Sequence, residues 1–545
     1  MKSFRLRLFA GKFSCRKSAL WALVFVCLVI MYIRPVNAGP RGGLLVVAQP
    51  YEAMTLDPAL VEDWFSAQVT TQIFDTMLRY KPDSDKLEPG LATSWAPFKE
   101  GKVWVFWLRK NVYFHDGTVF DAQAVKFNLE RQGFPVFSPY PPGEKTFVIW
   151  KTLFDGFPGV LRSVDIMDSH TIKVNLSEPM IYFPRCLANP QFGIISPNSA
   201  RETGPDIYKN PVGTGPFRFR EWRRGQRVII QANSDYWEGR PELDQIIFNA
   251  VSGGIARRQL LEREKVQVAL GLRMEDVRIM KKQALFPIRR MPRPNFMFLA
   301  MNCSRYPFNR LPVRLALNYG INRKQFLKKF YGTRAILAGS IVPPGCLGYS
   351  PEIYGYPYDL KKARRLLYYS GPANNFRTTL LIPEKDTAYC QDAWQIARHL
   401  VENDFKNLGW KVKIVSKDNE EFYRLVRSGD YDMALWGIEG IASITDAYMS
   451  ANWSSFVSTD KRGNVSFFKY PRLDEILSAA RKNSDLKYRS GLYHKLEAII
   501  NQQAPIVPLV FDYNYSGLNP SLRGLRFGSL NYYDFSRAWM EEPVY

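Results

Sequence analysis

Few residues in the 545-residue chain are spaced for catalysis or for binding a metal ion. The sequence contains no nucleophile elbow, no Walker A loop and no EF-hand loop, and no two histidines have the spacing of zinc ligands on a helix. Gly213-Thr214-Gly215 lacks the third glycine of a dinucleotide-binding turn and precedes Pro216, so we interpret it as a tight turn. The patterns predict no catalytic residue, no metal site and no cofactor, and we expect that the protein is not an enzyme. The four histidines are His115, His170, His399 and His494.

His115 is the one histidine in a sequence context that could support catalysis, Phe-His-Asp-Gly-Thr. A histidine can serve as a general base near neutral pH. A lone histidine beside an Asp-Gly turn is more often structural, and we assign His115 that role.

Aromatic side chains are abundant, with 13 Trp, 29 Tyr and 36 Phe. They bury a large area at little cost in rotamer entropy and present polar edges, so they suit a cleft that holds a flexible ligand. The alternative is core packing, which we expect for most of them. Those in polar or loop-like contexts include Trp436, Tyr448, Trp453 and Tyr532-Tyr533.

The composition is that of a large globular protein. Hydrophobic residues make up 46% of the chain and charged residues 23%, and the mean hydropathy is −0.24. Such a chain can bury sizeable cores, and its length corresponds to about three to four domains or one large composite fold. Mainly disordered and polytopic membrane proteins are excluded.

The segment 1–38 has the pattern of a secretory signal peptide. Six basic residues and no acidic one precede the uncharged apolar run 19–33, and Val36-Asn37-Ala38 resembles a cleavage site. The run is 15 residues long, shorter than the roughly 20 that a membrane-spanning helix needs. We expect cleavage after Ala38 and a periplasmic protein, with an uncleaved amino-terminal anchor as the alternative. Neither Cys15 nor Cys27 has the context of a lipid-attachment site.

The chain is strongly basic, with a formal net charge of +23 that removal of residues 1–38 lowers to +16. The basic residues occur as scattered doublets and not in one cluster, so we expect solvated faces and no nucleic-acid partner. An even number of cysteines in an oxidising compartment permits one or two disulfides, and their spacing does not suit a metal. These cysteines are Cys186, Cys303, Cys346 and Cys390.

Strand and helix patterns alternate along the chain, which indicates an α/β fold. Asp121, Asn322 and Asp359 each precede a helical run and are expected N-caps, and Gly371 is expected to end the third of these helices. The segment 133–159 is dense in Pro, Gly and aromatic residues and predicts an ordered loop. Strands are expected at 43–48, 103–114, 171–176, 378–382, 411–415 and 431–436, and helices at 66–78, 313–319 and 392–408.

Several long motifs, in the same order, closely resemble the family 5 extracellular solute-binding proteins, which are the oligopeptide- and dipeptide-binding components of ABC importers. The resemblance extends from about residue 43 to the end of the chain. The motifs are LDPAL (56–60), LATSWAPFKEGKVWVFWLRKNVYFHDGTVFDAQAVKFNLER (91–131), NPVGTGPFRF (210–219), NSDYWEGRPELDQIIF (233–248), VRLALNYGINRKQFLKKFYG (313–332), YPYDLKKARRLLYYSG (356–371) and SGDYDMALWG (428–437).

The resemblance implies a bilobal periplasmic-binding-protein fold with an extra domain inserted in the first lobe. Lobe I would comprise 39–78, 192–293 and 511–545, the inserted domain II 79–191, and lobe III 294–510. It implies a monomer that captures oligopeptides or peptide-like solutes in the interlobe cleft and delivers them to a membrane permease and its ATPase. Closure would be a hinge motion that the ligand favours. A secreted hydrolase or an envelope interaction protein is the remote alternative.

The resemblance also implies a ligand site, from which this sequence departs at two positions. Relatives often anchor the peptide amino terminus with an Asp in a pattern like G-W-x-x-D, whereas this chain has Ile438 and Ile441 after Gly437. Glu439 or Asp446 could supply the missing charge, because an unpaired buried ammonium is costly. Equally, the ligand could be a non-peptide such as a metal chelate, haem or a glutathione-type conjugate. The other expected ligand-binding residues are Glu62, Trp436, Tyr448 and Trp453.

Overall fold

The computed structural model describes residues 42–541 except 83, 85, 135–146, 155, 333–334, 345, 373–374, 388, 439–444, 456–462, 484, 529 and 531. The expected signal peptide and two of the expected site residues, Glu439 and Ile441, lie outside the described residues.

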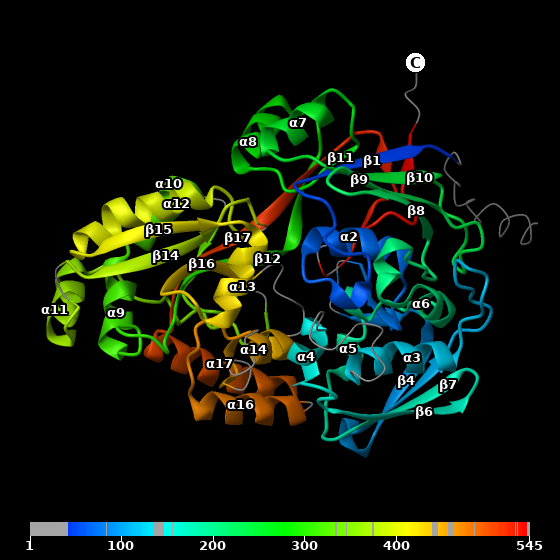
Figure 1. Ribbon diagram of the computed structural model, residues 1–545, viewed down its shortest axis with the longest axis horizontal. Helices are drawn as coiled ribbons and strands as arrows, with labels where there is room; N and C mark the ends of the chain where they lie inside the picture. Colours follow the sequence, from blue (N-terminus) through cyan, green and yellow to red (C-terminus); the bar gives the residue numbers. More distant parts are fainter. Residues whose placement is uncertain are drawn as a thin grey trace, which may run out of the picture.

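An eleven-stranded sheet runs through the molecule in the order β15-β14-β16-β12-β17-β11-β1-β10-β9-β8, with β13 paired to β17 (Figure 1). The strands β14, β15 and β16 pair in parallel, as do β1, β10 and β11. The strands are β1 (Leu44–Gln49), β8 (Phe217–Arg223), β9 (Arg227–Ala232), β10 (Gln245–Ala250), β11 (Val268–Ala269), β12 (Ile288–Met301), β13 (Ile336–Leu337), β14 (Arg377–Pro383), β15 (Lys411–Lys417), β16 (Met433–Ile438) and β17 (Ile506–Leu518).

The two longest strands, β12 and β17, join the two halves of this sheet. One end of their antiparallel ladder pairs Ala300 with Ile506, and the other pairs Ile288 with Gly517. The register shifts between Arg290 and Pro294, and a proline has no N–H to give to a ladder. We name the strands β13–β16 with their helices the β14 half, and β1 with β8–β11 and their helices the β1 half.

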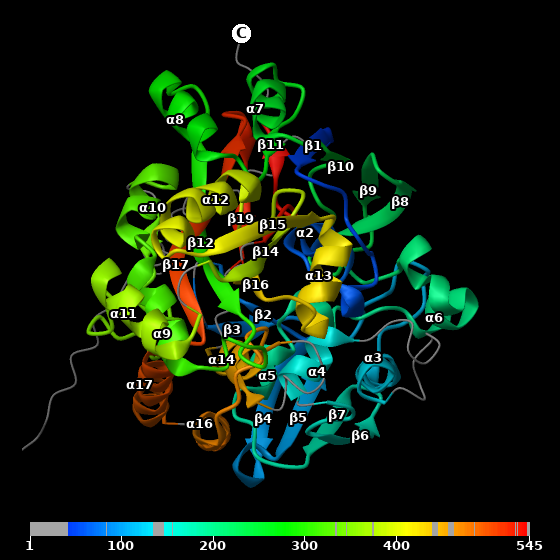
Figure 2. The same cartoon turned by 60° about the vertical axis from the view of Figure 1, so that its left-hand side comes forward.

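The β14 half is a sheet covered on both faces. Its central strands read as continuous apolar runs, such as MALWGI in β16, because neither face meets water. Helices α9 to α12 pack on one face, and α13, α14, α16 and α17 on the other (Figure 2). These helices are α9 (Leu311–Gly320), α10 (Arg323–Phe330), α11 (Leu360–Ser370), α12 (Ala393–His399), α13 (Asn419–Ser428), α14 (Thr445–Trp453), α16 (Pro471–Lys482) and α17 (Leu486–Gln503).

The expected helix caps are confirmed. The Asp121 carboxylate accepts from the Ala124 N–H, the Asn322 side chain from the Gln325 N–H, and the Asp359 carboxylate from the Lys362 N–H. Each bond satisfies an N–H that has no partner inside its helix. Gly371 ends α11 with a φ of 96°, a conformation that side chains rarely adopt.

A four-stranded antiparallel sheet, β4-β5-β7-β6, forms a separate unit beside the β1 half (Figure 1). Its core receives apolar residues from α3, α4 and the 3-10 turn η1. The β1 half is covered by α2 and α6 on one side and by α7 and α8 at one end. The bounds are η1 (Pro58–Leu60), α2 (Trp64–Ile73), β4 (Ala92–Phe98), β5 (Val103–Leu108), α3 (Ala122–Gly133), α4 (Val148–Phe154), β6 (Leu161–Asp168), β7 (Thr171–Leu176), α6 (Pro197–Thr203), α7 (Gly254–Glu262) and α8 (Met274–Gln283).

Several sequence expectations need correction. The helix expected at 66–78 ends at Ile73, and Leu78 starts a short strand, β2 (Leu78–Tyr80). Part of the loop expected at 133–159 is the helix α4, whose Trp150 and Phe154 fill the core of the four-stranded unit. The helix expected at 392–408 changes to a π-helix at Leu400. The four cysteines in the described part of the chain form no disulfide, so the pairing that their even number permitted is not seen.

The Gly213-Thr214-Gly215 segment passes very close to the backbone of Ile73, as a tight turn requires. A Cβ at Gly213 would stand 2.2 Å from the carbonyl oxygen of Ile73, and one at Gly215 would stand 2.5 Å from its carbonyl carbon. Neither distance is possible for real atoms, so only glycine fits here. Thr214 between them donates to the Asp75 carboxylate at 3.0 Å.

Candidate functional site

The end of β16 carries three of the expected site residues, Trp436, Gly437 and Ile438. A Cβ at Gly437 would lie 2.3 Å from the ring of Tyr389, so the glycine allows this ring to lie close against the strand. Ile438, the last residue of β16, is partly exposed. The described strand therefore ends in a group of aromatic rings, which we name the aromatic wall, with an accessible apolar edge at Ile438. The wall comprises Trp436, Tyr389, Phe422 and Tyr423.

Trp436 belongs to this wall and is only 8% exposed. Its indole stacks on Phe422 with ring centres 5.8 Å apart, and Tyr423 and Tyr389 approach it at 5.4 and 6.3 Å. Phe422 and Tyr423 come from α13, so the wall ties that helix to the sheet. Each such aromatic pair stabilises the packing by about 0.5–1.5 kcal/mol beyond the area that it buries.

Tyr448 and Trp453 lie deeper, on α14. Tyr448 is 4% exposed and donates its hydroxyl to the Ile341 carbonyl at 2.7 Å. Burial raises the pKa of Tyr448 well above its ordinary value. Trp453 is 2% exposed and lies against Phe298. Both residues pack in the core beneath the wall and do not line an accessible surface.

The remaining expected residues near this strand are less fully described. Glu439 and Ile441 lie outside the described residues, and the backbone of Asp446 is in α14. The amine anchor that Glu439 or Asp446 would supply therefore stays a prediction.

Glu62 makes an ion pair that bridges the two halves of the large sheet. Its carboxylate accepts from the Arg427 guanidinium, which comes from the last turn of α13. Both side chains are about one-third exposed, 33% for Glu62 and 30% for Arg427. Arg427 also lies over the Tyr423 ring, 5.6 Å from its centre. Figure 2 shows α13 beside the segment that leads into α2. The pair thus connects the aromatic wall to the β1 half.

Arg427 was not among the residues expected from the sequence. It stands at the end of an amphipathic helix whose N-cap is Asp418, where an arginine normally faces solvent. Nothing local in the sequence indicates that it meets Glu62, 365 positions away.

Two further groups of ion pairs cross between parts of the molecule. Arg273, at the start of α8, donates to Asp386 at 2.9 Å and lies 3.4 Å from Asp392. Arg481 and Lys482, at the end of α16, lie 3.1 and 3.6 Å from Glu178 after the four-stranded sheet. Each of these pairs keeps substantial contact with solvent on at least one partner, so each contributes little stability on its own.

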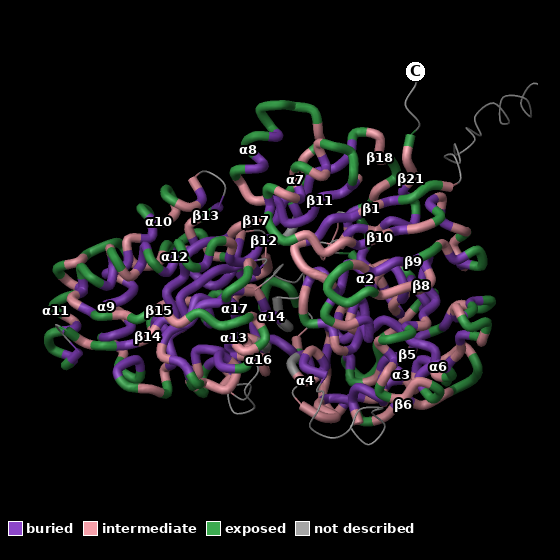
Figure 3. Tube along the Cα trace, turned by 45° about the horizontal axis from the view of Figure 1, so that its top comes forward, coloured by how far each residue is buried: buried purple, intermediate pink, exposed green. Residues whose placement is uncertain are grey.

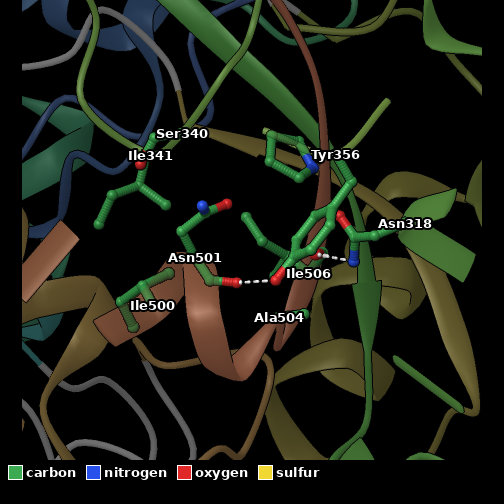
Figure 4. A pocket seen from close by; sticks show the side chains of 9 residues that line it. Asn318, Ser340, Ile341, Tyr356, Ile500, Asn501, Ala504 and Ile506 are labelled. Atoms are coloured by element: carbon green, nitrogen blue, oxygen red, sulfur yellow. Dashed lines mark hydrogen bonds between the residues drawn. The ribbon is translucent and has the colours of Figure 1, made fainter. Parts of the chain in front are cut away.

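A small recess lies inside the β14 half, between α17, α9 and the loop that carries Tyr356 (Figure 4). Tyr356 donates to the Asn501 carbonyl at 2.6 Å, and Asn318 donates to the Ile506 carbonyl at 3.0 Å. The donors of Tyr356 and Asn318 are therefore already used by the backbone and are not available to a solute in the recess.

His115 is held by the backbone. Its Nδ1 accepts from the Gly213 N–H at 3.3 Å, and its Nε2 donates to the Gly215 carbonyl at 3.0 Å. Burial lowers its pKa to about 4, which keeps the ring neutral. The histidine therefore fixes the close backbone approach at Gly213 and Gly215.

Two features are absent from the described part of the chain, a membrane-spanning helix and a cluster of metal ligands. Within 42–541, apart from the gaps named above, no helix is long and apolar enough to cross a membrane. The same residues contain no group of three or more His, Cys, Asp or Glu side chains that could hold a metal ion.

Comparison with known proteins identifies the family. The model of the bacterial extracellular solute-binding proteins, family 5 Middle, matches residues 86–460. Heme-binding protein A of Haemophilus influenzae is 27% identical over 86% of this chain and 87% of its own length. The glutathione-binding protein GsiB of Salmonella choleraesuis is 27% identical over 88% of this chain and 91% of its own.

The solved structures include close matches to the whole fold. The periplasmic binding protein DppA of Helicobacter pylori, in complex with the peptide STSA, matches with a TM-score of 0.85 and 29% identity, over 92% of this chain and 99% of its own. The mixed α/β architecture is therefore that of the bilobal periplasmic binding proteins. Because the family model matches more than half of the chain, the protein belongs to the bacterial extracellular solute-binding proteins, family 5.

Proposed function

We propose that the chain captures oligopeptides or peptide-like solutes in a cleft between two lobes and delivers them to the permease and ATPase of an ABC importer, without catalysing a reaction itself. The observation that carries the proposal is the match of nearly the whole chain to a peptide-bound transport protein. The ion pair between Glu62 and Arg427 supports it, because it crosses between the two halves where a closing cleft would meet.

The proposed lobes follow the arrangement of the sheets. Lobe I (39–78, 192–293 and 511–545) contains the β1 half, lobe III (294–510) the β14 half, and the inserted domain II (79–191) the four-stranded unit. The proposed boundaries at 293 and 511 fall inside β12 and β17, near the register shift. Two strands that cross between lobes can bend while the packed cores on each side stay rigid.

The proposed setting is the periplasm, reached by a signal peptide that is cleaved after Ala38. The basic run and the apolar run within 1–38 support this setting. We further propose that the protein acts as a monomer and has no nucleic-acid partner.

The ligand contacts are proposed at the cleft edge of β16 and at Glu62. In the described structure Ile438 and the Glu62–Arg427 pair are accessible, whereas Tyr448 and Trp453 are buried beneath the aromatic wall. A peptide amino terminus would need a carboxylate here, and Glu439 is the proposed anchor. Glu439→Ala should weaken binding of a peptide with a free amine far more than binding of its acetylated form. Equal losses for both peptides would show that Glu439 does not bind the amino terminus.

A non-peptide solute is the second candidate. It is favoured by Ile441, which stands where relatives place an anchoring Asp. Haem and glutathione are the ligands in the names of two relatives of this chain, so the fold accommodates such solutes.

Identification of the co-purified solute tests the proposal. The protein released from the periplasm is measured by native mass spectrometry, then denatured, and the released small molecules are identified. Heterogeneous peptides of a few residues would support peptide capture. One non-peptide species would overturn the peptide proposal in favour of the second candidate, and shortened products formed from an added peptide would contradict both.

A further inference from the structure

The end of the β14 half farthest from the β1 half is a dense cationic surface. It is formed by α11, which lies at the extremity of the molecule (Figures 1 and 3). Between Tyr358 and Arg377 the single acidic residue is Asp359, and its carboxylate caps the helix. Lys361, Arg364 and Arg365 are exposed on the outer side of this helix.

Basic residues from three other segments join this helix. Arg310 donates to the Ser370 carbonyl at the end of α11, and Arg364 donates to the Asn407 carbonyl in the turn before β15. Lys411, at the start of β15, bonds through its backbone N–H to Phe376. We name this surface the basic tip, and its members are Arg310, Lys361, Arg364, Arg365, Arg377, Lys406 and Lys411.

The charges of the basic tip are not neutralised by neighbours. None of its seven members pairs with a carboxylate within the described part of the chain. The bonds that Arg310 and Arg364 do make go to backbone carbonyls, which leave the positive charge in place. This distinguishes the tip from the ion-paired arginines elsewhere, such as Arg398 with Glu402.

Exposed tyrosines accompany the charges. Tyr306, Tyr368 and Tyr369 are 54%, 73% and 80% exposed. Tyr306 lies under the Arg310 guanidinium, 5.3 Å from it, and the Tyr368 and Tyr369 rings touch edge to face. In the segments that form the tip, every exposed large apolar side chain is a tyrosine. Tyrosine is enriched where one end of a side chain meets lipid and the other meets water.

We propose that the basic tip docks on the surface of an anionic phospholipid bilayer. Lysines and arginines near such a surface are attracted by its negative potential, and interleaved aromatic rings enter the headgroup layer. A bilayer surface meets both features in one layer, because its headgroups carry the negative charge and its interface accepts tyrosine rings. An acidic protein partner is the alternative that the experiment below separates from it.

The position of the tip makes this docking compatible with solute capture. The tip belongs to the β14 half alone and lies at the opposite end from β8, β9 and β10 (Figure 1). The β1 half can therefore move while the tip stays on the membrane. The inference goes beyond the proposed transport role and does not depend on which solute is bound.

Vesicle co-sedimentation of the protein released from the periplasm, with its amino terminus verified by mass spectrometry, tests the proposal. Vesicles of phosphatidylcholine and phosphatidylglycerol, mixed seven to three, are compared with vesicles of pure phosphatidylcholine at low salt. We expect binding to the anionic vesicles only. K361E/R364E/R365E should lower the partition coefficient at least tenfold, and Y368A/Y369A should lower it several-fold with no change of net charge.

The matched control is R278E/K281E/K282E, which reverses three exposed charges on α8 and changes the net charge equally. It should change binding less than twofold. Equal losses for the two triple variants would overturn the proposal, since net charge alone would then explain binding. Binding of the wild type to an acidic protein column without binding to anionic vesicles would overturn it in favour of a protein partner. All variants should keep the wild-type thermal unfolding profile, because the changed side chains are exposed.

Discussion

Asp57 and Glu62 stand five positions apart, and each pairs with an arginine from another part of the molecule, but the two ion pairs differ sharply in burial. Asp57 makes two hydrogen bonds of 3.0 Å with Arg131, and neither side chain has any exposed surface. Glu62 pairs with Arg427, and both keep about one-third of their surface exposed.

The difference separates a permanent interface from one that can open. Asp57 and Arg131 join η1 to α3, so their pair is sealed inside the core shared by the β1 half and the four-stranded unit. Breaking it would leave a charge in an apolar interior at a high cost. The Glu62–Arg427 pair can separate into water at almost no cost. One short segment thus fixes the four-stranded unit and lets the β14 half move.

The largest effect is expected when the permanent pair is broken. Arg131→Met should lower the free energy of unfolding by about 3–5 kcal/mol, because the buried Asp57 carboxylate would lose its cationic partner, although it would keep its bond to the Ala59 N–H. Urea denaturation measures this loss. Replacing both partners, as Asp57→Leu with Arg131→Met, should recover part of it. A loss under about 1 kcal/mol for the single variant would contradict a sealed interface.

Glu497 is a third case, a buried carboxylate that has no arginine or lysine paired to it in the described structure. Burial raises its pKa to about 7, although Ser340 and backbone N–H groups oppose the shift. Because the folded pKa exceeds the unfolded value of 4.5, the protonated form stabilises the fold at low pH. That contribution is lost as the pH rises through about 7.

The stability of the protein should therefore depend on pH through Glu497. Between pH 5 and pH 8 this one group should cost the wild type about 2–3 kcal/mol, and Glu497→Gln should remove that part of the slope. Urea denaturation of both proteins at the two pH values measures it. Equal slopes for wild type and variant would show that Glu497 titrates normally.

The aromatic wall, which lies next to the Glu62–Arg427 pair, should be destabilised by added side-chain volume. Gly437→Ala would place a Cβ against the Tyr389 ring and should cost about 1–3 kcal/mol. The control is Gly491→Ala in α17, where a Cβ meets nothing within 4 Å and alanine favours the helix by up to about 1 kcal/mol. Thermal unfolding compares the two. No loss of stability in Gly437→Ala would show that the Tyr389 ring can move to accommodate the added methyl group.

The smallest stability effect is expected at the separable pair. Arg427→Gln should change the free energy of unfolding by less than about 1 kcal/mol, because its charge remains hydrated. It should nevertheless shift the unliganded protein toward the open form, seen as a larger radius of gyration by X-ray scattering. Arg424→Gln is the control, since Arg424 pairs with Glu421 inside the same helix. Equal scattering changes for both variants would show that Arg427 does not bridge the two halves.

The sequence predicts the elements better than the contacts between them. The caps at Asp121 and Asp359 are local, so a short motif reveals them. The helix at 66–78 is overextended because the apolar residues of β2 continue its spacing by chance. Whether Trp436, Tyr448 or Trp453 lines a surface or lies in the core depends on what packs on it, which is a tertiary property. Arg427 could not be identified because its partner is distant in the chain.

The most direct test of this account measures two distances in one experiment. Spin labels at exposed Ile255 and Tyr369 span the β1 and β14 halves, and labels at Ile255 and Met167 span the β1 half and the four-stranded unit. Pulsed dipolar spectroscopy compares the protein before and after its solute is removed. We expect that removal of the solute lengthens the first distance and leaves the second unchanged. If both distances change, or neither does, the division into a permanent and a separable interface is wrong.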